Sequence, residues 1–154
     1  MKEIKVWDLF TRLFHWGLVA LVGFSFYTGW RGGLQLRFAK GLFGVGHPEL
    51  LIVGAGPETA GGVLNDVSAR VRAGAQLVPG ERLTFEEWPH QVIVEEVPNP
   101  GEIAFAANRF YQRPDEYSVA LLQLTYDDRN GKFPWEDGYA VPAWVQPRPG
   151  EFRA

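Results

Sequence analysis

The sequence predicts an α+β fold, in which a small mixed or mainly antiparallel sheet carries two helices on one face. Leu50 to Val53 is a short aliphatic run closed by Gly54, which is typical of a buried strand. Val119 to Tyr126 is apolar on both faces, so we expect it to be a central strand. The elements follow one another as strand, strand, helix, strand, strand, helix, strand, with links short enough for hairpins.

The first predicted helix is marked at both ends. Pro57 suits the first helical position, Glu58 complements the positive end of the helix dipole, and Gly74 suits a left-handed cap at the other end. Gly61 and Gly62 weaken this helix, which predicts a close approach to the sheet. Its core face repeats at helical spacing: Ala60, Val63, Leu64, Val67 and Val71.

Shorter signals predict the remaining elements. Arg82 to Phe85 and His90 to Val97 are typical of strands. Asn99 to Glu102 has the pattern of a capping box, and the helix that it starts is expected to run to about Arg113. Phe133 to Phe152 is rich in Pro, Trp and Gly, so we expect irregular structure that crosses the domain and covers the edge of the sheet.

The N-terminal part is a different kind of sequence. Leu13 to Trp30 contains no charged residue and would span about 27 Å as a helix. This predicts one transmembrane helix, with a signal peptide or a buried core helix as alternatives. The predicted division is a hydrophobic segment over 1–33 and an α+β domain over 36–152. We expect a cytoplasmic domain attached to the membrane through Leu13 to Trp30, and basic residues on the two sides of the run balance, which leaves the orientation open.

Composition excludes several classes of function. A net charge of −3 without any block of Lys or Arg argues against nucleic acid as a partner. The chain has no cysteine, which excludes disulfides, thiolate metal sites, iron–sulfur clusters and cysteine nucleophiles.

Two motifs carry a family resemblance. Gly46 to Leu50 reads Gly-His-Pro-Glu-Leu, and Gly131 to Trp135 reads Gly-Lys-Phe-Pro-Trp. With these motifs, the stretch from Phe38 to Phe152 resembles the bacterial family named domain of unknown function (DUF) 4262. The resemblance implies a small soluble α/β domain, and it implies no particular reaction.

A second resemblance concerns Val6 to Gly29. Its Val-Trp-Asp followed by Arg12 and the pair His15-Trp16 is similar to the first helix of membrane b-type cytochromes, such as the cytochrome b subunit of nickel–iron hydrogenases. The resemblance implies that His15 is a haem ligand. Such haems lie between two histidines in a four-helix bundle, whereas this chain has one apolar run, so no cofactor is expected and haem b remains the alternative. Two resemblances that meet near residues 31–40 indicate a gene fusion or a misassembled start.

The glycine-rich turn after the first strand imitates a dinucleotide-binding fingerprint. Thr59 stands where the third glycine is needed, and no acidic residue ends a second parallel strand about twenty residues later. We therefore do not expect a dinucleotide, although the free amides of the helix start leave anion binding open.

His47 and Glu49 are the residues with the most chemical potential. They suit a metal pair or a general base with its orienting carboxylate, which would make the protein a metal-dependent or hydrolase-like enzyme. Two ligands do not make a zinc site, so no metal is expected. The sequence favours a structural interpretation, in which Pro48 stiffens the strand entry and both side chains satisfy backbone groups there.

The predicted site depends on how two strands pair. If Leu50 to Val53 and Val119 to Tyr126 are antiparallel neighbours, the start of one faces the end of the other. This would gather His47, Glu49, Asp127 and Trp135 in a shallow polar pocket, walled by Trp135 and Phe133. The sequence thus favours a non-enzymatic ligand-binding or protein-interaction module, and it names neither the small molecule nor the protein partner.

Overall fold

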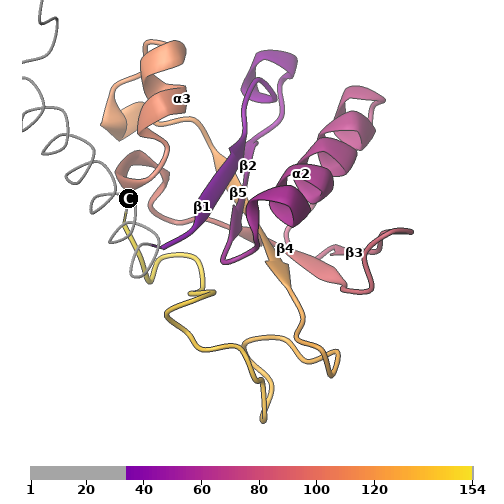
Figure 1. Cartoon of the computed structure of the whole chain (residues 1–154). Coiled ribbons are helices and arrows are strands. Elements are labelled where there is room, and N and C mark those ends of the chain that lie inside the picture. The colour runs from indigo at the N-terminus through magenta and orange to yellow at the C-terminus, as the bar shows by residue number, and fades with distance from the viewer. Residues whose placement is uncertain (1–33, 154) are drawn as a thin grey trace, which may run out of the picture. The chain divides into compact units, whose positions relative to one another are not determined.

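A computed structural model describes residues 34–153 (Figure 1). The chain divides into two units, Met1–Gly33 and Leu34–Ala154. The predicted hydrophobic helix over Leu13 to Trp30, together with His15, lies outside the described residues. Among the helices that are described, none has the length and apolar character needed to cross a bilayer.

Five strands form one mixed sheet in the order β1-β2-β5-β4-β3. The strands are β1 (Leu36–Ala39), β2 (Glu49–Val53), β3 (Arg82–Leu83), β4 (Val92–Glu96) and β5 (Leu121–Tyr126). β2 and β5 pair in parallel, whereas every other neighbouring pair is antiparallel. The α+β class and the mixed sheet are confirmed, and β5 is the central strand.

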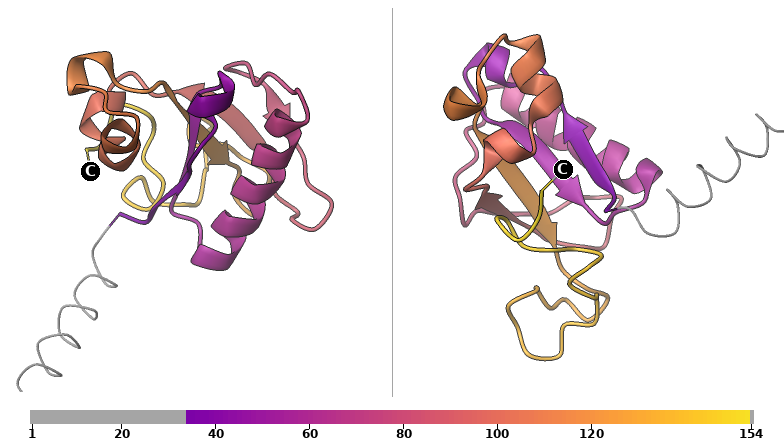
Figure 2. Two further views of the ribbon diagram at one scale, coloured as in Figure 1. Left: turned by 90° about the horizontal axis from the view of Figure 1, so that it is seen from above. Right: turned by 90° about the vertical axis from the view of Figure 1, so that its left-hand side faces the viewer.

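The two helices of residues 34–153 lie on opposite faces of the sheet, so the prediction that they share one face is wrong. They are α2 (Pro57–Arg72) and α3 (Phe105–Phe110), and three short 3-10 turns accompany them. Figure 2 shows α2 and α3 on either side of the sheet. Leu50 and Ile52 of β2 pack in one core cluster with α2, while Leu51 and Val53 pack in a second cluster with α3. All five residues of β2 are buried, which requires cover on both faces.

Helix α2 has the predicted ends and core face. Pro57 is its first residue, Gly74 follows it with φ of +106°, and the predicted apolar positions are buried. The expected close approach at Gly61 and Gly62 is wrong, because a Cβ added at either position would meet no atom within 4 Å. Glycine costs about 1 kcal/mol relative to alanine inside a helix, and packing does not explain that cost here.

The second helix is shorter than predicted. A 3-10 turn, Pro100–Glu102, is followed by α3, which ends at Phe110 rather than near Arg113. Asn99 does not cap the backbone, because its Nδ2 donates to Glu102 Oε2 at 2.9 Å and to the carbonyl of Phe152 at 3.1 Å. Asn99 therefore holds the backbone at Phe152 instead of capping a long helix.

The C-terminal segment, 133–152, has no strand or helix, as predicted from its composition. It forms hydrogen bonds to the inner strands β5 and β4 and packs with β2, so the prediction that it covers the edge of the sheet is wrong. Gln146 contacts β5 where β2 has ended: its Oε1 accepts the N–H of Tyr126 at 3.0 Å, and its Nε2 donates to the carbonyl of Tyr126 at 2.9 Å. A Cβ at Gly54, which has φ of +78°, would lie 2.4 Å from the carbonyl oxygen of Val145. Because Gly54 has no side chain, the C-terminal segment can pass close to the end of β2.

Candidate functional site

The predicted site residues do not gather in one pocket. β2 and β5 are neighbours, but they are parallel, and Glu49 is paired with Leu121 at the start of β5. Asp127 follows the last residue of β5, so about 20 Å of strand separates it from Glu49 at ~3.3 Å per residue. The shared site required β2 and β5 to be antiparallel, and that prediction is wrong.

His47 is occupied by the backbone. It is 2% exposed, its Nδ1 lies 2.7 Å from the carbonyl oxygen of Pro48, and its Nε2 accepts the N–H of Leu77 at 3.3 Å. Because Nε2 accepts, the tautomer that fits both contacts is the one in which Nδ1 donates to the carbonyl of Pro48. Neither nitrogen remains for a metal or a substrate.

Glu49 is also occupied by the backbone. Its carboxylate is 1% exposed and accepts the N–H groups of Gly41, Leu42 and Phe43 at 3.0, 3.3 and 3.2 Å. Three amides satisfy the charge that burial would otherwise penalise. His47 and Glu49 both serve backbone groups at the entrance to β2, which is the structural alternative that the sequence allowed.

His90 and Asp127 form the histidine–carboxylate pair of this domain. His90 Nδ1 lies 2.8 Å from Asp127 Oδ1, which also accepts the N–H of Gln91 at 3.0 Å. The imidazole packs against Trp88 and Tyr126, with centroids 4.9 and 6.1 Å away. Within residues 34–153, no three His, Asp or Glu side chains are close enough to hold one metal ion. The hydrogen bond to Asp127 orients the His90 imidazole, and the imidazole packs against the Trp88 indole.

Asp128 organises the loop that follows β5. Amide donors of Lys132, Ala140 and Asn130 hold the pKa of its carboxyl below its usual value of 3.8, with Lys132 the largest cause. Burial raises the pKa of the nearby Tyr126 to about 12, and the phenol of Tyr139 adds to this increase. These groups hold the C-terminal segment against β5.

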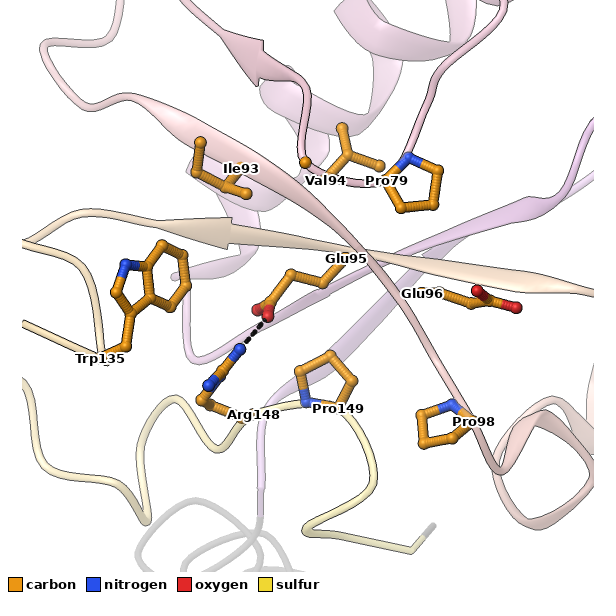
Figure 3. Close-up of a pocket in the computed structure, with 10 residues that line it drawn as sticks. Pro79, Ile93, Val94, Glu95, Glu96, Pro98, Trp135, Arg148 and Pro149 are labelled. Carbon is orange, nitrogen blue, oxygen red and sulfur yellow. Dashed lines mark hydrogen bonds and ion pairs between the residues drawn. The ribbon is translucent and has the colours of Figure 1, made fainter.

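Trp135 lines a pocket of about 650 Å³ on the sheet face away from α2 (Figure 3). Glu95 Oε1 and Arg148 are 2.5 Å apart, and Glu95 Oε2 accepts the hydroxyl of Thr125 at 2.6 Å. Trp135 stacks on Phe133 with centroids 5.0 Å apart, and the Arg148 guanidinium lies 5.0 Å from the indole. Glu95, Arg148 and Trp135 already have partners within the domain. The main role of the Trp135 pocket is therefore to hold the C-terminal segment against the sheet.

A larger cavity of about 730 Å³, the α2 hollow, lies between α2 and the connection from β3 to β4. Its lining residues are Glu58, Thr59, Gly62, Val63, Asp66 and Arg70 of α2, and Phe85, Glu86, Glu87 and Trp88 of the connection. Four carboxylates and one guanidinium give this lining a net charge of −3. The surface of the hollow is therefore strongly acidic.

Arg70 is the one cation among the described residues that line the hollow, and its Nη2 already has partners. It pairs with Asp66 at 2.6 Å, donates to the carbonyl of Thr84 at 3.0 Å, and lies 5.2 Å from the centre of the Phe85 ring. Exposed carboxylates without a hydrogen bond or ion pair among the described residues complete the rim: Glu58, Glu86 and Glu87.

The aromatic wall of the hollow is fixed before any ligand binds. Phe85 and Trp88 are half-buried, pack against the α2 core cluster, and have ring centroids 5.8 Å apart. Trp88 also contacts the rings of His90 and Tyr126. This packing removes Phe85 from the sheet, which explains why β3 ends at Leu83 rather than at the predicted Phe85.

One family model, described as Domain of unknown function (DUF4262), matches residues 24–140, about three-quarters of the chain. The chain belongs to this family. No curated protein and no solved structure matches it. The DUF4262 match begins within the apolar run, earlier than the resemblance that starts at Phe38, and it ends before Trp144. The cytochrome-like residues 6–29 lie largely ahead of the match and outside the described part.

Sequence reasoning missed the α2 hollow of the DUF4262 domain. Two signals were present: Phe85 to Trp88 places two acids between two aromatics, and Gly62 interrupts the predicted helix. Neither signal is specific alone, because the helix and the connection meet only in the folded domain. Trp135 was singled out from the sequence and does line a pocket, but in the company of Glu95 and Arg148.

Proposed function

We propose that this DUF4262 domain is a non-enzymatic binding module that takes an organic cation into the α2 hollow. One observation carries the proposal: three unpaired carboxylates surround a cavity whose wall holds two fixed aromatic rings. A cation near the face of an aromatic ring gains about 0.5 to 2 kcal/mol, more when water is excluded. Clustered like charges in a concave surface also concentrate counter-ions.

The arrangement of the carboxylates favours an extended cation over a metal ion. They come from two separate elements and line a cavity of about 730 Å³ instead of converging on one point. Metal ions need ligands at about 2 to 2.6 Å from one centre. Arg70, which lies over Phe85, is an internal example of a cation that this wall accommodates.

Binding is favoured over catalysis by the chemistry of the lining. Among the described residues, the lining includes one hydroxyl side chain, Thr59, and no histidine that would serve it as a base. The metal-dependent or hydrolase-like alternative at His47 and Glu49 loses its support, because backbone groups use both side chains. A protein partner remains compatible with the proposal if it inserts a cationic group into the hollow.

The proposal is tested by isothermal titration calorimetry of the full chain with tetraethylammonium chloride, and with sodium benzoate as the anionic comparison. We expect saturable binding of the cation in the millimolar range, weakened by added salt because the carboxylates are exposed. Replacing Glu86→Gln together with Glu87→Gln should lower the affinity roughly two- to thirtyfold, given about 0.2 to 1 kcal/mol for each exposed charge.

The matched control is Asp137→Asn, which removes an exposed carboxylate of the C-terminal segment and should leave the affinity unchanged. Failure of tetraethylammonium to bind, equal binding of benzoate, or an equal loss in the Asp137 variant would each contradict the proposal.

A further inference from the structure

Gly62 is a glycine without a structural reason in its own helix. Its φ is negative, so the backbone does not require glycine. A Cβ at this position would meet no atom within 4 Å, so close packing does not require glycine either. Glycine lowers helix stability relative to alanine. Gly62 therefore weakens α2 without a backbone or packing requirement for glycine. It does line the α2 hollow, and we therefore expect its role to lie there.

Gly61 provides the comparison. It precedes Gly62 in the same helix, has a negative φ, and also has no atom within 4 Å of an added Cβ. Gly61 does not line the α2 hollow, whereas Gly62 does. The two glycines therefore share their effect on the helix and differ in their position relative to the cavity.

The hollow suits one kind of organic cation better than another. A primary ammonium group has three N–H donors, which are best satisfied by acceptors that converge on the nitrogen. The carboxylates around the hollow are dispersed instead, and the wall beside Gly62 offers the apolar side chain of Val63 and the rings of Phe85 and Trp88. A quaternary ammonium group donates no hydrogen bond and is attracted by aromatic faces and by dispersed negative charge.

We infer that the ligand class of the α2 hollow is alkyl-substituted, quaternary ammonium compounds, and that Gly62 determines this specificity by leaving room for the alkyl groups. The inference rests on the proposed function, since it concerns the same cavity. Any side chain at position 62 would project into the space that an alkyl substituent fills, while a small primary ammonium would still be admitted.

The test compares the full-length wild type with Gly62→Ala, Gly62→Leu, Gly61→Ala and Gly61→Leu. Calorimetry with tetraethylammonium and with ethylammonium measures the specificity, and thermal unfolding reports the fold. Both alanine variants should raise the unfolding midpoint. Gly62→Ala should weaken tetraethylammonium binding at least fivefold, Gly62→Leu should abolish it, and ethylammonium affinity in Gly62→Ala should stay within twofold. The Gly61 variants should bind both probes as the wild type does.

The outcomes separate the two claims. Wild type that binds neither probe overturns the proposed function and this inference with it. Wild type that prefers ethylammonium overturns the quaternary ligand class and leaves cation binding intact. Equal losses of tetraethylammonium affinity at positions 61 and 62, or no loss at position 62, overturn the assignment of Gly62.

Discussion

Glu49 is a buried carboxylate whose hydrogen-bond partners are all backbone amides. Gly41, Leu42 and Phe43 present three N–H groups that lie in a turn and have no strand to pair with. The carboxylate accepts from all three amides, and none of its hydrogen-bond partners in residues 34–153 is a cationic side chain. Glu49 thus ties the segment that precedes β2 to the start of that strand.

Replacing Glu49→Gln should destabilise the domain by about 2 to 4 kcal/mol, because a neutral amide accepts more weakly and places an NH₂ group against buried N–H donors. Urea unfolding followed by circular dichroism measures this loss. Glu96→Gln, an exposed position on β4, is the control and should change stability by less than about 0.5 kcal/mol. Equal unfolding midpoints for the two variants would show that the amides do not depend on Glu49.

At the scale of single residues, the sequence indicated which side chains were unusual but not what they contact. His47 and Glu49 stood out because their residue types are common in catalysis, and both proved to be occupied by backbone groups. The backbone donors and acceptors that occupy them belong to the turn before β2 and to the segment after α2. Such partners have no signature in residue spacing, so the predicted chemistry could not be separated from a structural role.

Among the elements, the C-terminal segment passes close to the sheet at Gly54. Gly54 allows the carbonyl of Val145 to pass close to the end of β2, and Gln146 then takes the place of a strand beside Tyr126. The segment has no helix or strand of its own, so its position depends on these contacts, on the Trp135 pocket, and on the hydrogen bonds that Asn99 and Asp128 make to it.

Gly54→Ala should displace this segment and lower stability by about 1 to 3 kcal/mol, since it adds both an unfavourable φ and a collision with the Val145 carbonyl. Gly46→Ala is the matched control: its φ is +80°, close to the +78° of Gly54, but an added Cβ meets nothing within 4 Å. Hydrogen exchange should accelerate at Val145 and Gln146 only in the Gly54 variant. Unchanged exchange there would contradict the role assigned to Gly54.

The elements that the sequence predicted best are those with signals at their ends. Pro57 and Gly74 fixed the limits of α2, and β5 was recognised from its continuous apolar run. The second helix was overestimated because the Asn99 pattern, which resembles a cap, is used to hold the carbonyl of Phe152. Local patterns predict an element reliably when its residues have no stronger long-range partner.

For the whole domain, the decisive fact is that β2 and β5 are parallel and central. Both strands are buried throughout, so each needs cover on two faces, which α2 supplies on one side and α3 with the C-terminal segment on the other (Figure 2). A strand buried on both faces loses the alternation that would reveal its pairing. Strand direction, and with it the position of Asp127, was therefore not predictable from the residues.

The α2 hollow is likewise a property of the assembled domain. Its acidic rim and aromatic wall come from a helix and a connection that are separated by the turn between Gly74 and Arg82. The overall charge of −3 gave no hint of a local cluster with that same net charge. The proposed function depends on three features that meet only at this cavity in the folded domain: the packed rings of Phe85 and Trp88, the unpaired carboxylates, and Gly62.

The most direct measurement of cation binding in this hollow is a nuclear magnetic resonance titration of ¹⁵N-labelled protein with tetraethylammonium chloride. We predict saturable shifts of the Trp88 indole N–H and of the Gly62 amide, because both residues line the hollow. The chemical shift of the Trp135 indole N–H should not change, since Trp135 lies in a separate pocket. Shifts confined to Trp135, or shifts at Trp88 that grow linearly without saturation, would contradict cation binding at the α2 hollow.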